Sequence, residues 1–416
     1  MDGTLAAGEV PLDALAREFG TPLYVYDWAV ARTNLERLRA AFGDADLLVA
    51  YSVKANGNLA LLARLAGEGA GADIVSGGEL HRCLLAGVPP ERIVFAGVGK
   101  TRDEIAAALD ARILAFNVES RGELEVIDAL ARERGVRARF AVRVNPDIEA
   151  GTPHEYTRTG HAATKFGVAA DEALALYRWA AGRPALEAVG IDVHIGSQIV
   201  EPEPYRRALA HVLEIADRLA SEGVSLRFVD LGGGYGVRYA DEEAMAIETL
   251  ARLVVPPVRE RGLRLVLEPG RFIVGDAGVL VARVLYVKRS GTKTFVITDG
   301  GMTELIRPSH YRGYHEIEPV RERPGAPRVT ADVVGPICET GDFLARERTL
   351  PLPEPGDLLA VRTAGAYGFT MASNYNGRRR PAEVLVDGDD VVLARRRESF
   401  DDLVRGERLP DGGYAP

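Results

Sequence analysis

The sequence predicts an α/β protein in which a (β/α)8 TIM-like barrel is joined to a C-terminal antiparallel β domain. Three observations lead to this prediction. Between about residues 45 and 270, short β-rich runs alternate with helical patterns; there are eight such runs; and after about residue 275 short strands separated by Gly, Pro and Asp replace the helices. Strands that alternate with helices favour right-handed βαβ units and a parallel sheet, and eight of them suggest a closed barrel. A doubly wound sheet is the structural alternative.

The eight candidate strands are mostly apolar runs that end at polar or glycine-rich turns. They cover residues 47–52, 71–76, 92–97, 112–118, 139–145, 188–197, 227–233 and 264–270. A segment rich in Ala, Leu, Glu and Arg follows each of the first seven, for example NLALLARLAGEG and RGELEVIDALARERG. The spacing of apolar residues in these segments is typical of amphipathic helices.

The sequence pattern of the C-terminal part predicts an antiparallel β sandwich or barrel. RVTADVVGP, DLLAVRTAGAY, AEVLVDG and DVVLARR are short strand-like runs with turn residues between them. TPLYVYD, near the N-terminus, is also strand-like and precedes the alternating region, so we expect it to join this sheet. The expected domains are therefore a barrel over residues 30–275 and a discontinuous β domain over residues 1–29 and 276–416.

Composition restricts the class of function. The 416 residues carry 60 Asp and Glu against 51 Lys and Arg, a net charge of -9, which disfavours a general nucleic-acid surface. The two cysteines, Cys83 and Cys338, lie far apart, so neither a metal site nor a disulfide framework is expected. The N-terminal residues lack the pattern of a signal peptide, and no apolar run reaches the roughly 20 residues of a membrane helix. A cytoplasmic protein with no membrane or nucleic-acid partner fits these features.

Polar residues and glycines gather where the predicted strands end, which in a (β/α)8 barrel is the end that carries the active site. Alone, each has an ordinary explanation: a lysine starts a solvated loop, a histidine is a hydrogen-bonded core residue, and glycines mark a tight turn. Their shared placement is what favours a site. The residues are Lys54, Asp73, His194, Ser197, Gly232, Gly233, Gly234, Glu268 and Arg271.

One ligand accounts for this combination. Glycines let backbone N–H groups approach a phosphate closely. Desolvation lowers the pKa of a lysine such as Lys54, which can then form a Schiff base. A carboxylate such as Glu268 can keep a pyridine nitrogen protonated, and an imidazole such as His194 can cover one face of a flat ring. Together these groups describe a site for pyridoxal 5'-phosphate.

Six motifs in order resemble the barrel-fold, pyridoxal-phosphate-dependent amino-acid decarboxylases, and most of all the branch of that family that acts on diaminopimelate. The motifs are YSVKAN, HIGSQI, DLGGGYG, EPGRFIV, CETGDFLA and GAYGFTMASNYNGRRRPAEVLV. The resemblance covers roughly residues 15–395, and shorter matches such as VSGGEL, FNVES, RVNP and TKFG agree with it. It implies decarboxylation of meso-2,6-diaminopimelate to L-lysine and CO2, the last step of lysine biosynthesis.

The resemblance also implies roles for individual residues around the cofactor. Lys54 would bind the cofactor covalently, His194 would stack on its ring and Glu268 would pair with its nitrogen. Asp73 would orient the lysine or the histidine, or would merely end a strand. The phosphate region would be held by Gly232, Gly233, Gly234, the backbone of Gly270 and Arg271, and the hydroxyl of Tyr375. Ser197 is also expected to bind the cofactor.

Further residues would bind the far end of the substrate. The resemblance implies that Arg271, Arg307 and Tyr311, with Tyr375 nearby, contact the distal carboxylate, for which the planar guanidinium is well shaped. Cys338 and Glu339 would reach the site from a second subunit, Cys338 as proton donor and Glu339 as partner of the distal ammonium. A homodimer with shared active sites would follow. Cys83 is expected only to pack a helix.

Three other functions compete with this one. A decarboxylase of the same fold could act on ornithine, lysine, a polyamine precursor or a carrier-bound amino acid, but such substrates with only a distal amine leave Arg307 and Tyr311 without a carboxylate. A racemase related to alanine racemase needs a second base on the opposite ring face, and its motifs differ from HIGSQI and CETGD. A non-catalytic homologue is disfavoured because Lys54, Glu268 and Cys338 are all present.

Overall fold

The computed structural model describes residues 3–157, 159–160 and 164–413, so the outermost residues of the expected β domain, 1–2 and 414–416, lie outside the described residues. The chain divides into two compact units. The barrel unit comprises Asn34–Arg238 and Glu243–Phe272, and the β unit comprises Met1–Thr33, Tyr239–Glu242 and Ile273–Pro416. Each unit has its own cluster of buried apolar side chains.

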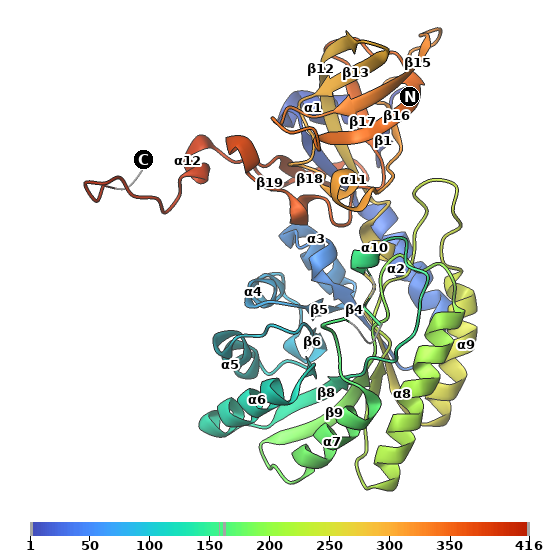
Figure 1. Ribbon diagram of the computed structural model, residues 1–416, viewed down its shortest axis with the longest axis vertical. Helices are drawn as coiled ribbons and strands as arrows, with labels where there is room; N and C mark the ends of the chain where they lie inside the picture. The colour runs from blue at the N-terminus through green and yellow to red at the C-terminus, as the bar shows by residue number, and fades with distance from the viewer. Residues whose placement is uncertain (1–2, 158, 161–163, 414–416) are drawn as a thin grey trace. The chain divides into compact units, whose positions relative to one another are not determined.

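Eight strands close into a barrel in the barrel unit, which confirms the predicted fold class and excludes the doubly wound sheet (Figure 1). All eight pairings are parallel, and the ring closes where β11 pairs with β4. Each strand overlaps one of the predicted runs. The strands are β4 (Leu47–Ser52), β5 (Gly71–Ile74), β6 (Ile93–Phe95), β7 (Ala115–Val118), β8 (Ala138–Arg143), β9 (Leu186–Asp192), β10 (Phe228–Asp230) and β11 (Arg264–Leu267).

Helices return the chain from each strand to the next and surround the barrel (Figure 1). Several begin at a side chain that accepts backbone N–H groups of the first turn: Asn58, Ser76, Thr101 and Ser120. These caps follow the strands closely, so the helix N-termini lie at the same end of the barrel as the strand C-termini. The helices are α2 (Trp28–Phe42), α3 (Leu59–Gly67), α4 (Gly77–Leu85), α5 (Arg102–Ala111), α6 (Arg121–Arg134), α7 (Ala170–Ala181), α8 (Glu203–Ser221) and α9 (Ile247–Glu260), with short 3-10 turns at η1 (Val53–Ala55), η2 (Pro90–Arg92) and η3 (Glu155–Thr157).

Apolar side chains fill the barrel interior below the strand C-termini. Leu48, Val94, Val189 and Phe228 belong to one buried cluster contributed by different strands. Gly190 in β9 faces Phe228, and a Cβ at this position would overlap the phenyl ring. The glycine therefore makes room for Phe228, whose burial contributes about 1.5–3 kcal/mol of hydrophobic stabilisation. Because the interior is packed, polar chemistry is confined to the barrel end.

The β unit holds a nine-stranded sheet whose main path is β16-β15-β13-β12-β3-β18-β19, with β14 and β17 beside it. As predicted, the N-terminal strand joins this sheet: β3 lies between β12 and β18. The strands are β3 (Leu23–Asp27), β12 (Gly278–Ser290), β13 (Lys293–Thr298), β14 (Ile317–Pro319), β15 (Arg328–Val334), β16 (Phe343–Pro351), β17 (Leu358–Val361), β18 (Ala382–Asp387) and β19 (Asp390–Arg395).

The sheet departs from the prediction in strand direction. The β3–β18 and β13–β15 pairs are parallel, so the sheet is mixed rather than wholly antiparallel. Both pairs join strands that are not connected by a tight turn, and only hairpin connections require an antiparallel neighbour.

The remaining elements are β1 (Ala6–Ala7), β2 (Val10–Pro11), α1 (Leu12–Phe19), α10 (Arg271–Val274), α11 (Arg307–Tyr311), α12 (Phe400–Leu403), η4 (Phe369–Met371) and η5 (Tyr375–Gly377).

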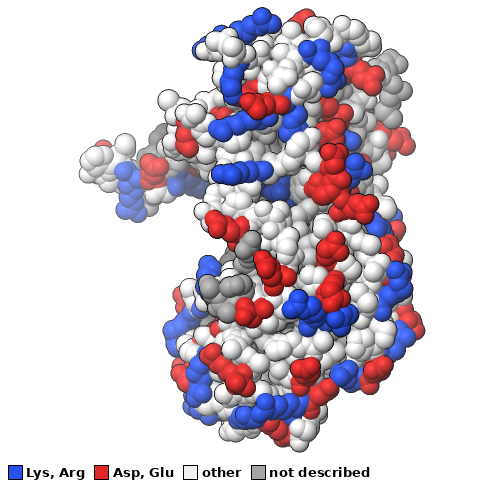
Figure 2. All heavy atoms as spheres, turned by 45° about the vertical axis from the view of Figure 1, so that its right-hand side comes forward, with Lys and Arg blue, Asp and Glu red and all other residues white. Residues whose placement is uncertain are grey.

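Charges of both signs share the surface in Figure 2. On this face Lys and Arg side chains are interspersed with Asp and Glu rather than gathered into the continuous basic stripe typical of nucleic-acid binding. Many form exposed ion pairs, for example Arg178 with Glu222 and Arg261 with Asp217. In the part of the chain that the structure describes, no helix has the length and apolar character needed to cross a membrane.

A buried carboxyl group in the β unit makes stability depend on pH. Glu304 is 2 % exposed, and burial raises its pKa to about 7, although the N–H of Gly301 and the hydroxyl of Thr303 hydrogen-bond to it and oppose the shift. The ordinary value of 4.5 holds in the unfolded chain. The protonated carboxyl group therefore stabilises the fold fully below pH 4.5, and this contribution is lost as pH rises through the folded pKa.

Glu304→Gln is expected to flatten this dependence, because the amide stays neutral. The free energy of unfolding of the variant minus that of wild type should therefore rise from pH 5 to pH 8, by up to about 3 kcal/mol. Thermal unfolding at both pH values measures the difference, with Glu407→Gln, at an exposed position, as the control. Parallel pH profiles for wild type and Glu304→Gln would show that this carboxyl group does not carry the effect.

Candidate functional site

Lys54 lies directly after β4 and is paired with a buried carboxylate. Its Nζ is 3.0 Å from Oδ2 of Asp73, the residue before the end of β5, and the Asp73 side chain is fully buried. Ser52 places its Oγ 2.6 Å from the same oxygen and 3.1 Å from the carbonyl oxygen of Glu268. The lysine side chain itself is 33 % exposed. A lysine at the tip of a buried strand is thus held by its neighbouring strand and faces the open end of the barrel.

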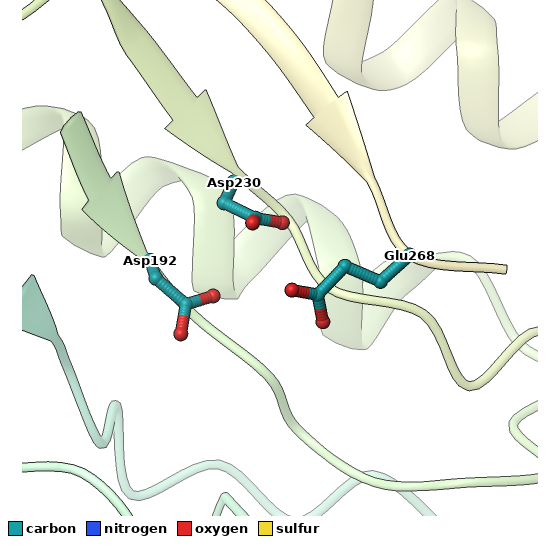
Figure 3. Close-up of side chains that lie close together, drawn as sticks. All are labelled: Asp192, Asp230 and Glu268. Atoms are coloured by element: carbon teal, nitrogen blue, oxygen red, sulfur yellow. The ribbon is translucent and has the colours of Figure 1, made fainter. Parts of the chain in front are cut away.

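Three carboxyl groups meet at the ends of consecutive strands. Asp192 ends β9, Asp230 ends β10 and Glu268 follows β11, and their side chains point toward one another (Figure 3). One oxygen from each lies within 4.8 Å of the others, and all three residues are buried. The amide of Asn117 donates to Asp230 at 3.3 Å and to Glu268 at 3.5 Å. Three acidic groups that are this close together and buried from water cannot all be ionised without a cation between them.

The pKa values follow from this crowding. Burial first, and then the neighbouring carboxylates, raise the pKa of Glu268 and of Asp192 well above the usual range. Burial also raises the pKa of Asp230 to about 7, against hydrogen bonds from Gly232 and Asn117 that lower it. The group therefore favours a ligand that brings a protonated nitrogen. Of these acids the sequence identified only Glu268; the charged residue at the end of each apolar run was the available signal for Asp192 and Asp230.

His194 follows β9 and is neutral. Burial, and then the positive charges of Arg143 and Lys54, hold its pKa well below the usual value. Its Nδ1 accepts a hydrogen bond from the N–H of Gly233 at 3.1 Å, so Nε2 carries the ring proton. A neutral imidazole fixed at one nitrogen presents a flat face, and it suits ring stacking better than proton transfer near neutral pH.

Three consecutive glycines after β10 form a turn into which no side chain fits. A Cβ on Gly232 would overlap His194, one on Gly233 would overlap the carbonyl oxygen of Glu268, and one on Gly234 would overlap the carbonyl oxygen of Gly196. Nearby, Nη2 of Arg271 donates to Oγ of Ser197 at 3.1 Å. The N–H groups of Gly232 and Gly233 already donate to Asp230 and His194. As a cradle for an anion, the turn offers a close approach to a backbone without side chains, next to a guanidinium and a hydroxyl.

Gly233→Ala is expected to weaken both the fold and the binding of a phosphorylated ligand. The overlapping atom is the backbone oxygen of Glu268, directly after β11, so it cannot rotate away as a side chain could. We expect a lower unfolding temperature and at least about tenfold weaker binding. Gly122→Ala is the matched control, because a Cβ there meets nothing within 4 Å on helix α6 and alanine favours helix. Unchanged ligand affinity in Gly233→Ala would argue against the cradle.

Unsatisfied polar atoms show that this end of the barrel is built for a polar ligand. Among the described residues, four buried atoms at the strand ends have no hydrogen-bond partner: Asp73 Oδ1, Asn117 Oδ1, Arg143 Nη2 and Asp192 Oδ1. Buried polar groups are normally hydrogen-bonded, and leaving one unpaired costs roughly 1–3 kcal/mol. Carboxyl groups for a protonated nitrogen, a cradle for a phosphate and a lysine for a carbonyl therefore fit pyridoxal 5'-phosphate.

The remaining predicted residues lie in the β unit. Arg307 and Tyr311 are four residues apart on α11 and so share a face. Arg307 is 7 % exposed; its Nη1 donates to Nε2 of His315 at 2.7 Å, and its guanidinium stacks 4.5 Å above the ring of Tyr239. His315, which sequence reasoning did not identify, is fixed by a 2.8 Å hydrogen bond between Nδ1 and the carbonyl oxygen of Arg362.

Cys338, Glu339 and Tyr375 lie on two neighbouring loops of the β unit. The N–H of Cys338 donates to Oδ1 of Asn376 at 2.9 Å, which places the thiol-bearing loop beside the loop of Tyr375. All three side chains are exposed, and Cys338 is a free thiol, whereas Cys83 is buried. Asp342 shapes the first loop by accepting the N–H groups of Ile337 and Met302, both at 2.6 Å. This structural role was missed from the sequence.

Comparison with known proteins gives one consistent result. Residues 30–275 match the family model for the pyridoxal-dependent decarboxylase, pyridoxal binding domain. A diaminopimelate decarboxylase of Pseudomonas aeruginosa is 50% identical over 412 residues, which is 98% of this chain and 98% of that protein. The crystal structure of diaminopimelate decarboxylase from Helicobacter pylori complexed with L-lysine has a TM-score of 0.91 and 41% identity, covering 95% of this chain and 98% of that one. An enzyme of the same name from Aquifex aeolicus is 49% identical over 97% of this chain and 95% of its own length.

Proposed function

We propose that this chain, which belongs to the pyridoxal-dependent decarboxylase family, converts meso-2,6-diaminopimelate to L-lysine and CO2. The observation that carries the proposal is the identity to diaminopimelate decarboxylases, which is near one half and extends over almost the whole of both chains. The barrel end adds physical support, since its groups match each polar part of pyridoxal 5'-phosphate.

The cofactor supplies an electron sink for the pair of electrons left when CO2 departs. Around it, Lys54 provides the amine for covalent attachment, and Asp73 positions that amine. Glu268 would pair with the ring nitrogen; burial, and then the carboxylates of Asp230, Asp73 and Asp192, raise its pKa, so a protonated nitrogen beside it would be stabilising. Neutral His194, whose Nδ1 is held by the N–H of Gly233, would cover one face of the ring and exclude water from it.

The phosphate is held by the glycine turn after β10 and by groups around it. These are Gly232, Gly233 and Gly234, with Ser197, Gly270, Arg271 and Tyr375. Gly270 suits this position because a Cβ there would lie 2.8 Å from the Cβ of Ala55 and 3.0 Å from that of Ser52. The backbone of Gly270 can therefore approach a ligand only because it lacks a side chain.

Specificity for the distal end of the substrate comes from charge. Arg271, Arg307 and Tyr311 bind the distal carboxylate, and the stacking of Arg307 on Tyr239 fixes the guanidinium before substrate arrives. Glu339 binds the distal ammonium and Cys338 delivers a proton to Cα. Both side chains are exposed on the single chain, which supports their reaching the active site of a second copy.

The protein is accordingly proposed to be a cytoplasmic homodimer with shared sites. In this arrangement residues 30–275 form the cofactor domain, and residues 1–29 and 276–416 complete the active site and the dimer interface. Two free thiols are in keeping with a reducing compartment. The charge match between the distal groups and diaminopimelate is the reason to prefer this substrate over ornithine or lysine.

A substrate comparison tests the proposal. The purified protein, supplied with pyridoxal phosphate, is incubated separately with meso-diaminopimelate, L-ornithine and L-lysine, and products are identified by mass spectrometry. We expect L-lysine from the first incubation and negligible diamine from the others. Release of putrescine or cadaverine without formation of L-lysine would show that ornithine or lysine, and not diaminopimelate, is the substrate. Absence of any product from protein fully loaded with cofactor would oppose the enzymatic role.

A further inference from the structure

Arg143 is a buried cation at the end of β8 to which sequence reasoning assigned no role. It is 6 % exposed, and its Nη1 donates to Oε1 of Glu119 at 3.2 Å. Its Nε lies 3.9 Å from Oδ2 of Asp192, one of the three carboxyl groups in Figure 3. The guanidinium stacks 4.9 Å from the ring centre of Phe166. Burial alone would lower the pKa of Arg143, but the charges of Glu119, Asp192 and Glu268 outweigh this, and the pKa is raised.

Glu119 holds the guanidinium in one orientation. Besides Arg143, its carboxylate accepts the N–H of Gly97 at 3.0 Å and the N–H of Gly167 at 2.9 Å. Three donors on one buried carboxylate leave it little freedom to move. The orientation of Arg143 is therefore set by the loops that contain Gly97 and Gly167.

A second buried pair fixes Glu119 in turn. Glu123 accepts the backbone N–H of Glu119 at 2.9 Å and receives Nζ of Lys100 at 2.6 Å. Lys100, whose side chain is wholly buried, also donates to the carbonyl oxygens of Gly97 at 2.7 Å and Asn117 at 2.8 Å. A buried network whose polar groups are hydrogen-bonded in this way is rigid. It therefore restrains Glu119 and, through Glu119, the side chain of Arg143.

One donor of this arginine remains unused. Nη2 of Arg143 is buried and has no hydrogen-bond partner within the residues that the structure describes. The charge of Arg143 acts on both His194 and Glu268, so the guanidinium belongs to the cofactor end of the barrel. A buried, charged donor that is held in place but unpaired at this end of the barrel is positioned to donate to an acceptor on the ligand.

The cofactor has one polar group without an assigned partner. The phosphate, the ring nitrogen and the aldehyde carbon are matched by the glycine turn, Glu268 and Lys54, respectively. The phenolic oxygen of the ring is not matched. We propose that Nη2 of Arg143 donates a hydrogen bond to this oxygen, and that Glu119 is the positioning residue that aims it. The inference rests on the proposed cofactor and is independent of which amino acid is decarboxylated.

The experiment compares Arg143→Gln and Arg143→Lys with wild type and with Arg137→Gln, at an exposed position just before β8. The affinity for pyridoxal phosphate is measured by equilibrium dialysis of the apo-proteins. Loss of a charge-assisted hydrogen bond is expected to weaken binding roughly tenfold in both Arg143 variants. Arg137→Gln should bind as wild type does.

A pH titration of the visible absorption of the loaded protein gives a second readout. In the loaded protein the phenolic oxygen would share a proton with the nitrogen of Lys54, and a cation beside the oxygen would favour loss of that proton. Arg143→Gln should therefore raise the midpoint by about one pH unit, and Arg143→Lys, which keeps the charge, should raise it less. Glu119→Gln should shift the midpoint in the same direction, because Arg143 is no longer held. A merely structural defect would lower the unfolding temperature without moving the midpoint.

The outcomes separate the two proposals. If wild type binds pyridoxal phosphate and both Arg143 variants match its affinity, the inference is wrong while the proposed function stands. If Arg143→Gln does not fold, the affinity of Arg143→Lys decides, since its ammonium can still pair with Glu119. If the wild-type protein binds no pyridoxal phosphate, the proposed function and this inference fail together.

Discussion

Lys54→Ala is expected to abolish turnover of diaminopimelate, by roughly four orders of magnitude or more, because covalent catalysis through this amine has no substitute in the chamber. Lys54 is held 3.0 Å from a fully buried carboxylate, so its amine is aimed at one place before any ligand binds. A water molecule or a free amine from solution would have neither this position nor this orientation.

Spectroscopy distinguishes the expected cause from loss of folding. Wild type loaded with pyridoxal phosphate should show a visible absorption band that borohydride removes by reducing the bond to the lysine. Lys54→Ala should lack a reducible protein link while keeping a wild-type circular dichroism spectrum. Lys288→Ala, at an exposed lysine of β12, is the matched control. A protein–cofactor bond still trapped by borohydride in Lys54→Ala would assign the attachment to another lysine.

Much of the fold could be predicted because burial leaves a clear pattern in the sequence. Strands buried on both faces read as apolar runs, and each of the eight barrel strands overlaps a run identified in this way. β16 was missed because it reads FLARERTLP, in which charged residues interrupt the apolar ones. The parallel pairing of β13 with β15 was missed because strand direction depends on the path of the connection, which residue type does not record.

Site residues could be predicted from the sequence only where they visibly interrupt or end an apolar run. Lys54 and the glycine turn interrupt apolar runs, so they stood out. Asp192 and Asp230 also end such runs, yet nothing local shows that they approach Glu268; that requires closure of the barrel, which places β9, β10 and β11 side by side. Arg143 was quoted within a motif, but its unpaired donor is a property of the folded chamber.

Cys338→Ala is expected to keep the reducible visible band and to lose about 10²- to 10⁴-fold in turnover, the usual contribution of a positioned acid. The thiol is exposed on a loop fixed by Asn376 and Asp342, so its removal should leave the fold intact. Cys83→Ala would be a poor control because that thiol is buried. Cys338→Ser, which keeps a weaker hydroxyl donor, should retain more activity than alanine. Full activity in Cys338→Ala would exclude the thiol as proton donor.

Mixing the two inactive variants then tests whether one chain completes the active site of another. If Lys54 and Cys338 of different copies act together, a mixed dimer of Lys54→Ala and Cys338→Ala contains one intact site and one doubly defective site. Random exchange of equal amounts makes half of the dimers mixed, so about one quarter of wild-type activity should return. If both residues act within one chain, no pairing restores an intact site. Differently tagged subunits recovered together would prove that exchange occurred, and inactivity of that mixed dimer would place Lys54 and Cys338 of a working site in the same chain.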